Sequence, residues 1–242
     1  MKLTYLGTGN AFAPCRRWSS LLVNGSVLFD AGPSALYSLK QLGVDATGIR
    51  HIFLSHFHAD HCFGLPFLLL EYYFLAKTDA PLTLVGPVGV EDYVRRLLAL
   101  AYPEVAERPW PRPITFVEAQ DGDTQTVDGL TFTAIRVEHV PQVLDSFGYR
   151  VQFSDGVLAY SGDAALTEAL WTLLDRAQVC VLEAASQEHS AVHLGLQAMR
   201  AIVARVPAGT AILLNHLDVP DAEPWRDLPV IVPEDLATYQ VP

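Results

Sequence analysis

The segment Ser55-His56-Phe57-His58-Ala59-Asp60-His61 decides how this sequence is interpreted. It follows an apolar stretch over 49–55 that is typical of a β-strand, and it precedes a helix expected over about 61–76. Alternate residues of an extended segment point the same way, so His56 and His58 can chelate one ion, while the helix start turns Asp60 and His61 toward a second position. We also expect Asp60 to cap the helix, because its carboxylate can accept from free backbone amides.

The donor atoms of this segment favour a particular class of metal site. Imidazole nitrogens with carboxylate oxygens suit zinc, iron or manganese. The three cysteines, Cys15, Cys62 and Cys180, have no metal-type spacing, so a closed thiolate zinc site is not expected. A solvated histidine-rich loop is the alternative and the usual explanation of an isolated His-x-His. Four donors between a strand and a helix favour the metal site instead.

Three further donors, His139, Asp163 and His216, each follow an expected strand. Strand ends are where a rigid scaffold presents side chains to a shared rim. Each of these residues alone is more often a surface histidine or a turn aspartate. Their recurrence at strand ends predicts one common site.

The remaining pattern predicts the fold. Strands and helices fall into two successive halves, each with strands first, so we predict an α+β fold: a four-layer αββα sandwich in which two mixed β-sheets pack face to face with helices on the outside. Since no linker separates the halves, we expect residues 1–242 to form a single domain. The expected strands span 2–6, 20–23, 27–30, 49–55, 82–85, 115–118, 124–127, 130–137, 149–153, 157–161, 179–182 and 211–214, and the expected helices 34–42, 61–76, 90–101, 168–176 and 194–206.

Composition excludes several function classes. Half of the 242 residues are hydrophobic and 18% are charged, which is typical of a compact globular protein. The formal net charge of −11 gives no long-range attraction to nucleic acid or to an acidic membrane. The most apolar stretch, 63–75, contains Pro66 and Glu71 and is too short to span a bilayer. With no signal peptide at the start and an odd number of cysteines, we expect a cytoplasmic protein without membrane contact.

The histidine segment, followed by Gly64-Leu65-Pro66, resembles the signature of the metallo-β-lactamase fold. The likeness covers nearly the whole chain, because 6–9 and 28–32 resemble the first strand-turn and hairpin of that fold. Within the superfamily the sequence is most similar to the ribonuclease Z and phosphodiesterase branch. The motifs that carry this similarity are His139-Val140-Pro141, Phe147-Gly148-Tyr149, Tyr160-Ser161-Gly162-Asp163 and Leu182-Glu183-Ala184.

This resemblance implies a set of site residues and a cofactor. It implies two divalent metal ions, expected to be zinc, with manganese or iron as alternatives. Asp163 would bridge both ions. The first ion would be held by His56, His58 and His139, and the second by Asp60, His61 and His216.

The resemblance also implies an activity. Glu183 and His193 look like the carboxylate and the proton-donating histidine of that branch, and with Asp60 they are the residues predicted to act in catalysis. The implied protein is a dinuclear metal-dependent hydrolase of ester bonds, a phosphodiesterase on a small or single-stranded phosphodiester, using a metal-bridging hydroxide and a histidine general acid. Two alternatives remain open: a lactone, thioester or sulfate-ester hydrolase with the same metals, and a non-catalytic metal-binding accessory protein. His193 could also be an ordinary histidine at a helix start.

One departure from the branch bears on the substrate. Ribonuclease Z carries a long arm for transfer RNA between the positions that match His139 and Asp163, but here only 24 positions separate the two. A tRNA 3′-processing endonuclease is therefore a less favoured reading than an enzyme for a small-molecule or short nucleotide phosphodiester. In addition, Leu194-Gly195 stands where the branch usually has Ser or Thr, which weakens the expected support of His193.

Several other residues received structural interpretations. We expect His51 to be structural, His189 to be solvated at a rim, and Cys62 to pack inside a helix. The aromatic segment 72–74 with Trp110 is read as core, with a cleft wall or a homodimer contact as alternatives. Whether the Pro-rich loop 102–113 forms a lid is left open.

Overall fold

The computed structural model describes residues 1–76 and 79–242, and in it the chain forms two mixed β-sheets. The first sheet has seven strands in the order β13-β1-β2-β3-β4-β5-β6. Strands β3 to β6 run parallel to one another, and β13, β1 and β2 pair antiparallel. Their bounds are β1 Lys2–Gly7, β2 Ser20–Val23, β3 Val27–Phe29, β4 His51–Phe53, β5 Leu82–Gly86, β6 Ile114–Glu118 and β13 Thr238–Gln240.

The second sheet has six strands in the order β12-β11-β10-β9-β8-β7. The strands from β7 to β10 form an antiparallel meander, and β10, β11 and β12 run parallel. Their bounds are β7 Thr124–Val127, β8 Leu130–Val137, β9 Ser146–Phe153, β10 Gly156–Tyr160, β11 Val179–Glu183 and β12 Ala211–Asn215.

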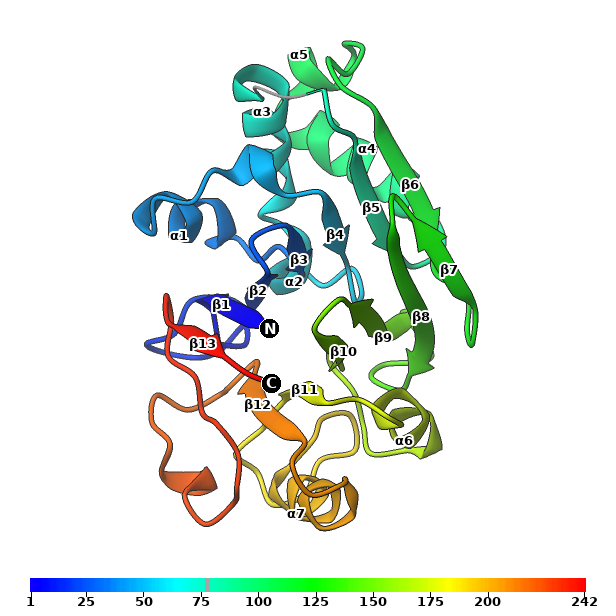
Figure 1. The fold of residues 1–242 in the computed structure, drawn as a ribbon. Coiled ribbons are helices and arrows are strands. Elements are labelled where there is room, and N and C mark those ends of the chain that lie inside the picture. The colour runs from blue at the N-terminus through cyan, green and yellow to red at the C-terminus, as the bar shows by residue number, and fades with distance from the viewer. Residues whose placement is uncertain (77–78) are drawn as a thin grey trace.

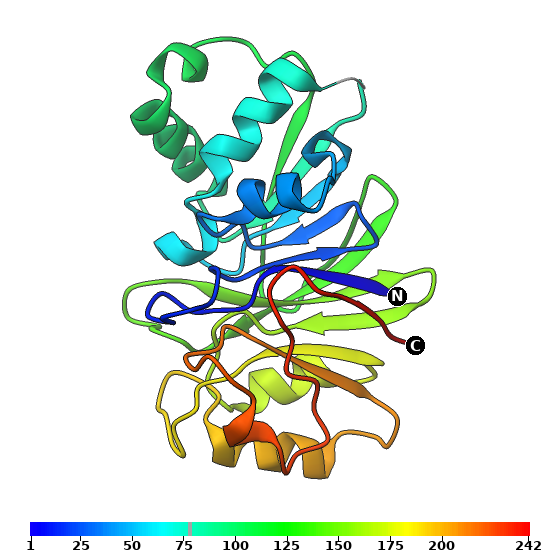
Figure 2. The ribbon, with the colours of Figure 1, turned by 90° about the vertical axis from the view of Figure 1, so that its left-hand side faces the viewer.

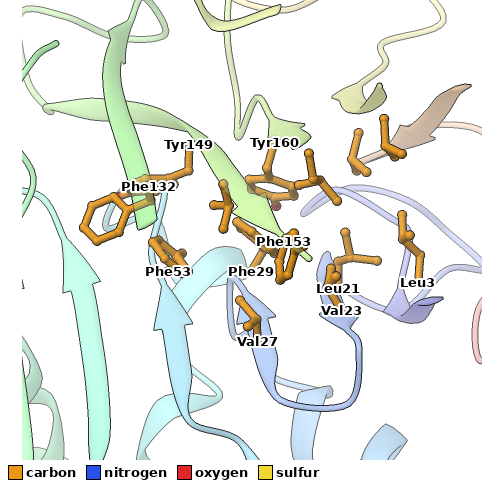
Figure 3. Close-up of a cluster of buried hydrophobic side chains, with 14 of the residues drawn as sticks. Leu3, Leu21, Val23, Val27, Phe29, Phe53, Phe132, Tyr149, Phe153 and Tyr160 are labelled. Atoms are coloured by element: carbon orange, nitrogen blue, oxygen red, sulfur yellow. The ribbon is translucent and has the colours of Figure 1, made fainter. Parts of the chain in front are cut away.

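The space between the sheets is filled by large apolar side chains from both of them (Figure 3). Strand alternation explains which residues point there, because successive side chains of a strand face opposite sides. In β3, Val27 and Phe29 enter this central cluster, whereas Leu28 points outward to the helices. Phe29 stacks on Tyr160 of the other sheet with ring centroids 4.9 Å apart, so the two sheets are in direct contact.

Helices cover the outer face of each sheet and give four layers in all (Figures 1 and 2). The predicted α+β sandwich of two mixed sheets is thereby confirmed. On the first sheet lie α1 Ala35–Gln41, α3 Leu65–Leu75 and α4 Val90–Ala101, and on the second lie α6 Glu168–Leu174 and α7 Leu196–Arg205. Within the described ranges, no helix has the length and apolarity needed to cross a membrane.

The helix predicted over 61–76 is wrong in its extent, because the segment forms two helices. The first is α2, Ala59–Cys62, and the second, α3, begins at Leu65 with Pro66 in its first turn. Proline has no N–H and cannot donate to the carbonyl four residues earlier, so one continuous helix cannot pass through Pro66. The chain therefore bends between the two helices.

The predicted capping role of Asp60 is also wrong. The N-cap position of α2 is His58, with no side-chain cap, and Asp60 lies inside the first turn. Its carboxylate instead accepts from His216 Nε2 at 3.1 Å, 156 positions along the chain. A long-range contact has replaced the local one.

The Pro-rich segment is packed against the first sheet rather than extended over a site. It contains a short helix, α5, Pro103–Ala106, and Trp110 packs with the apolar cluster outside the first sheet. Arg112 is buried, lies 4.4 Å above the ring of Tyr72, and donates to the carbonyls of Thr47 and Ala80. Tyr72 itself is core, as predicted, but Phe74 is 57% exposed, so the core prediction for 72–74 is wrong at that position. These contacts hold the segment down and do not suit a lid.

The bend between α2 and α3 depends on close backbone packing at Gly64. Its amide donates to Ala31 O at 2.8 Å, and a Cβ at Gly64 would lie 2.2 Å from Gly32 O. This contact joins the loop after β3 to the segment that carries the histidine cluster. A side chain at this position would push the two apart.

We predict that Gly64→Ala lowers the free energy of unfolding by about 1–3 kcal/mol, the usual range for overpacking. For a chain of this size that corresponds to a fall in melting temperature of about 2–12 °C. Gly48→Ala is the matched control, since Gly48 is exposed and a Cβ there has no atom within 4 Å. Equal melting temperatures for both variants in thermal unfolding would contradict the role given to Gly64.

Candidate metal centre

The predicted site residues lie in loops that follow strands of both sheets. His56 to His61 follow β4, and His139, Asp163 and His216 follow β8, β10 and β12. Figure 2 shows loops after β1, β8 and β11 gathered at the left edge of the sheets, opposite the two termini. Gly162, with φ +57°, allows the loop after β10 to approach Ser55 closely, because a Cβ there would lie 2.5 Å from Ser55 Cβ. The fold thus brings the seven predicted ligands together.

Five triads of donor atoms in the described residues lie close enough to hold an ion, and two of these groups match the resemblance-based prediction. Within each group the ring nitrogens and carboxylate oxygens lie within 4.8 Å of one another. In the first group His56 Nε2 is 2.9 Å from His58 Nδ1, and in the second His61 Nε2 is 3.1 Å from His216 Nε2. The first group is His56, His58 and His139, and the second is Asp60, His61 and His216.

Asp163 lies between the two groups. One carboxylate oxygen is 3.1 Å from His216 Nδ1 and 3.3 Å from His61 Nε2, both in the second group. The other oxygen is 3.7 Å from His139 Nε2 in the first group. A single buried carboxylate therefore faces donors of both groups, which is the position that a bridging ligand requires.

The chemistry of the donor set fits metal ions. His139 Nε2 is buried without a hydrogen-bond partner. Unpaired buried polar atoms are costly, and a cation is one way to satisfy them. Ring nitrogens about 3 Å apart also match tetrahedral zinc, whose nitrogen ligands at ~2.0–2.1 Å from the ion lie about 3.3 Å from each other.

Burial and mutual repulsion keep most of these imidazoles in their neutral, metal-binding form. Burial lowers the pKa of His56 well below its usual value, and the neighbouring His61 lowers it further. Burial likewise lowers the pKa values of His58 and His139, although the charge of Asp163 partly opposes the shift. A neutral ring has a free lone pair for a metal.

His61 differs because it lies between two buried carboxylates. Burial lowers its pKa, but the charges of Asp163 and Asp30 raise it more, and the net pKa lies well above the usual value. Burial raises the pKa of Asp163, but the charges of His216 and His61 lower it to well below its usual range. Without metal, a proton on His61 thus supplies positive charge that a bound cation would supply instead, so metal binding should release it.

Asp30 is a site residue that the sequence interpretation missed. Its carboxylate, fully buried at the end of β3, accepts from His61 Nδ1 at 2.8 Å and Tyr160 Oη at 2.7 Å. It also accepts from the amide and hydroxyl of Ser55 at 2.8 and 2.9 Å. By holding Nδ1, Asp30 directs His61 Nε2 toward the metal position. In the sequence, Asp30 appeared only as part of 28–32, the segment that resembles the hairpin of the fold family.

Glu183 and His193 form the predicted pair. Glu183, the last residue of β11, is buried and accepts from His193 Nδ1 at 2.9 Å and from the Ala164 amide at 2.6 Å. Burial lowers the pKa of His193, but its hydrogen bond to Glu183 and the charge of that group raise it more, to about 9. His193 is therefore protonated at neutral pH, and its side chain remains 31% exposed at the hollow described below.

The loop that carries His193 is tied to a predicted metal ligand. His139 Nδ1 donates to Val192 O at 3.1 Å, so the orientation of the ring depends on the backbone just before His193. Ser190 Oγ accepts from the amide of His193 at 3.1 Å. This hydroxyl holds the backbone at His193.

The other histidines and Cys62 lie outside the two groups. His51 is buried in β4 and donates to Val127 O at 3.1 Å, whereas His189 is exposed. Cys62 is buried in the cluster outside the first sheet, and burial raises its pKa to about 12. These positions agree with a structural His51, a solvated His189 and a packing role for Cys62.

An open hollow of about 300 Å³ gives access to the centre. Its floor consists of predicted ligands and His193, and its wall includes the loop between β1 and β2, which the sequence interpretation did not implicate. The residues of that wall are Asn10, Ala11 and Phe12.

The chain matches one family profile and is similar in sequence to curated proteins. The sequence profile of the family "Anti-Pycsar protein Apyc1" matches residues 1–218. A ribonuclease Z of Staphylococcus carnosus is 33% identical over 160 residues, which cover 63% of this chain and 49% of that protein. The chain spans about half the length of the curated relatives it matches.

Solved structures share the fold at low sequence identity. The human short-form tRNase Z superposes with a TM-score of 0.77 at 23% identity, covering both chains fully. A diphosphatase of the PhnP family gives 0.76 at 19% identity, over 100% of this chain and 98% of that one. Zinc-bound PqqB of Methylobacterium extorquens gives 0.73 at 15% identity over the full length of both. The predicted fold family is thereby confirmed.

We predict that Asp30→Asn lowers zinc affinity about 10- to 100-fold, the usual cost of removing a partner that orients a metal ligand. Asparagine tolerates the left-handed backbone at this position, where φ is +54°. The measurement is competition for zinc against a chromophoric chelator. Asp128→Asn is the control, because Asp128 has φ +48° and binds Thr83 Oγ1, remote from the ligands. Undiminished affinity in Asp30→Asn would remove Asp30 from the site.

Proposed function

The chain belongs to the Anti-Pycsar protein Apyc1 family and has the metallo-β-lactamase fold, and from this premise we propose that it is a dinuclear metal-dependent phosphodiesterase. The observation that carries the proposal is the position of Asp163, whose two oxygens face both groups of donors. One buried carboxylate shared by two ligand sets supports a pair of ions rather than a single one.

Two divalent ions, when bound, would lower the pKa of a water molecule and neutralise charge that develops on a phosphoryl oxygen. The protein supplies the rest. Asp163 and Asp60 contribute negative charge at the centre, and the buried imidazoles contribute neutral nitrogen donors. Asp30 and Val192 O hold the outer nitrogens of His61 and His139, so neither ring needs to reorient when substrate arrives.

We assign proton transfer to His193. The ring is exposed at the hollow and fixed by Glu183 at Nδ1, and its hydrogen bond to that carboxylate favours the protonated form. Nε2 is then free to protonate the leaving oxygen as the ester bond breaks. An acid in this position suits poor leaving groups such as alkoxides, and this favours phosphodiesters over activated esters.

We propose that the substrate is small or a short nucleotide, and not transfer RNA. Strands β9 and β10 form one hairpin between Ser146 and Tyr160, and it accounts for most of the interval in which the resembling branch inserts its arm. The net charge of −11 also gives no general attraction to a polyanion. The ribonuclease Z name of the Staphylococcus carnosus relative belongs to a protein about twice as long as the matched region.

Loaded with zinc or manganese, the protein should bind about two ions per chain and hydrolyse bis(p-nitrophenyl) phosphate and short dinucleotides. Chelation should abolish turnover, and added metal should restore it. His216→Ala should lower metal affinity by more than the ~10–100-fold that follows removal of an orienting residue, because this variant removes a direct donor.

The control for this experiment is His189→Ala, which removes an exposed histidine outside the donor groups. It should keep both ions and full activity. Turnover confined to lactones, thioesters or sulfate esters would replace the phosphodiester assignment, and efficient cleavage of precursor tRNA would overturn the size limit. Full metal occupancy without any hydrolysis would instead support an accessory protein.

The role of His193 predicts a dependence on the leaving group. For a dinucleotide, whose leaving group is a sugar hydroxyl, His193→Ala should lower kcat about 10²- to 10⁴-fold, the usual contribution of a general acid. For a p-nitrophenyl ester the loss should be much smaller, because that phenolate leaves without a proton. Glu183→Gln should show the same pattern to a lesser degree.

Metal content is measured alongside these rates, and it should not change in His193→Ala. Equal losses for both leaving groups would show that His193 does not donate the proton. A loss of metal would show that it acts mainly on the ligands.

A further inference from the structure

Phe12 is the most exposed large hydrophobic residue in the described part of the chain, with 91% of its surface accessible. It lies between β1 and β2 and lines the same hollow as Asp60, His193 and His216. Single exposed hydrophobic residues are common and usually need no explanation. Phe12 differs from the other exposed hydrophobic residues because it lines the hollow that contains predicted metal ligands.

The loop that carries Phe12 is fixed by its own hydrogen bonds. Asn10 Oδ1 accepts from the Phe12 amide at 2.9 Å, a local turn that sets the direction of the tip. Gly9 O accepts from the Ser19 amide at 2.9 Å, which closes the base of the loop. The Asn10 amide donates to Leu217 O at 3.1 Å, next to the predicted ligand His216. The tip of the loop is thus held at a fixed position relative to His216.

A second set of contacts anchors the loop to the C-terminal segment. The Arg16 guanidinium donates to the carbonyls of Val219 and Pro233 at 2.7 and 2.9 Å. Asp235 accepts from the amides of Thr8 and Arg17 at 2.9 and 2.6 Å. Because the loop is already anchored, little conformational entropy is lost when its exposed ring binds a ligand.

The hollow therefore combines two kinds of surface. Its floor offers a pair of cation positions, which suit a phosphate group, and its rim offers the face of an unpaired phenyl ring. Aromatic faces in water bind flat π-systems in offset or edge-on contact. Nucleobases stack on such side chains with little regard to sequence.

We propose that Phe12 is a specificity-determining residue whose ring stacks on a planar heteroaromatic group of the substrate, of the nucleobase type, while the phosphate occupies the metal centre. The proposal rests on the proposed function and adds the residue that contacts the group next to the phosphate. The proposal places the heteroaromatic group of the substrate beside the loop of Phe12 and not on the floor of the hollow.

The test measures binding and needs no turnover. Adenosine 5′-monophosphate and ribose 5-phosphate are titrated by calorimetry into zinc-loaded protein, since they share the sugar phosphate and differ in the base. Wild-type protein should prefer the nucleotide. Phe12→Ala should weaken nucleotide binding about 5- to 150-fold, the range that alanine substitution gives for base stacking, and leave ribose 5-phosphate unchanged.

Two variants and one control separate stacking from bulk. Phe12→Trp should keep or strengthen nucleotide binding, and Phe12→Leu, which retains apolar volume, should weaken it. Leu100→Ala removes another residue that is 85% exposed, from α4 and outside the hollow, and should change neither ligand. Equal weakening of both ligands in Phe12→Ala, or wild-type nucleotide binding in Phe12→Leu, would overturn the proposal.

The outcomes also distinguish this inference from the proposed function. Selective nucleotide binding without phosphodiester hydrolysis would contradict the catalytic assignment alone. Hydrolysis of dinucleotides with no dependence on Phe12 would contradict the stacking alone. A change of oligomeric state in Phe12→Ala, by sedimentation, with unchanged nucleotide binding would assign the ring to a protein contact and reject the substrate role.

Discussion

The buried carboxylate of Asp30 is the interaction on which the rest of this structure depends. It has no contact with solvent, and a charge in such a place is tolerated only when every lone pair is matched. Its partners come from different layers: Ser55 and His61 beside the first sheet, and Tyr160 from the second. The position of the two sheets, the end of β4 and the orientation of one predicted metal ligand are therefore set by the same group.

Around that group, the fold divides rigid support from chemistry. Strands end at one edge of the sandwich, and the donors occupy the first residues beyond them. The donors are then held from behind, His61 by Asp30 and His139 by Val192 O. The second of these contacts links the candidate metal centre to the loop of His193, so the proposed metal binding and the proposed proton donation depend on one backbone segment. Such outer contacts decide how well a site is pre-organised before any substrate binds.

The similarity to solved structures at 15–23% identity concerns this scaffold. Members of one fold carry different activities because their rims differ, not their cores. In this chain the rim is formed by the loop of Phe12 and the loop of His193, and the latter is tied by Ser186 to Asp218. The residues after 218 lie beyond the family match, yet Pro233 and Asp235 hold the Phe12 loop. The C-terminal segment thus belongs to the architecture of the site.

The sequence by itself determined the layered fold and singled out the candidate metal ligands. Alternating apolar residues specify strands. Imidazoles and carboxylates at strand ends are chemically conspicuous, so His56, Asp163 and His216 could be recognised without coordinates. Only the tertiary structure shows which groups Asp60, Asp30 and Val192 contact, and that Phe12 lines the hollow. The local rule for Asp60 predicted a cap, but a contact 156 positions away took its carboxylate. Asp30 and the carbonyl of Val192 act through partners remote in the chain, and Phe12 lines a hollow formed by distant segments. A local sequence pattern cannot predict such contacts.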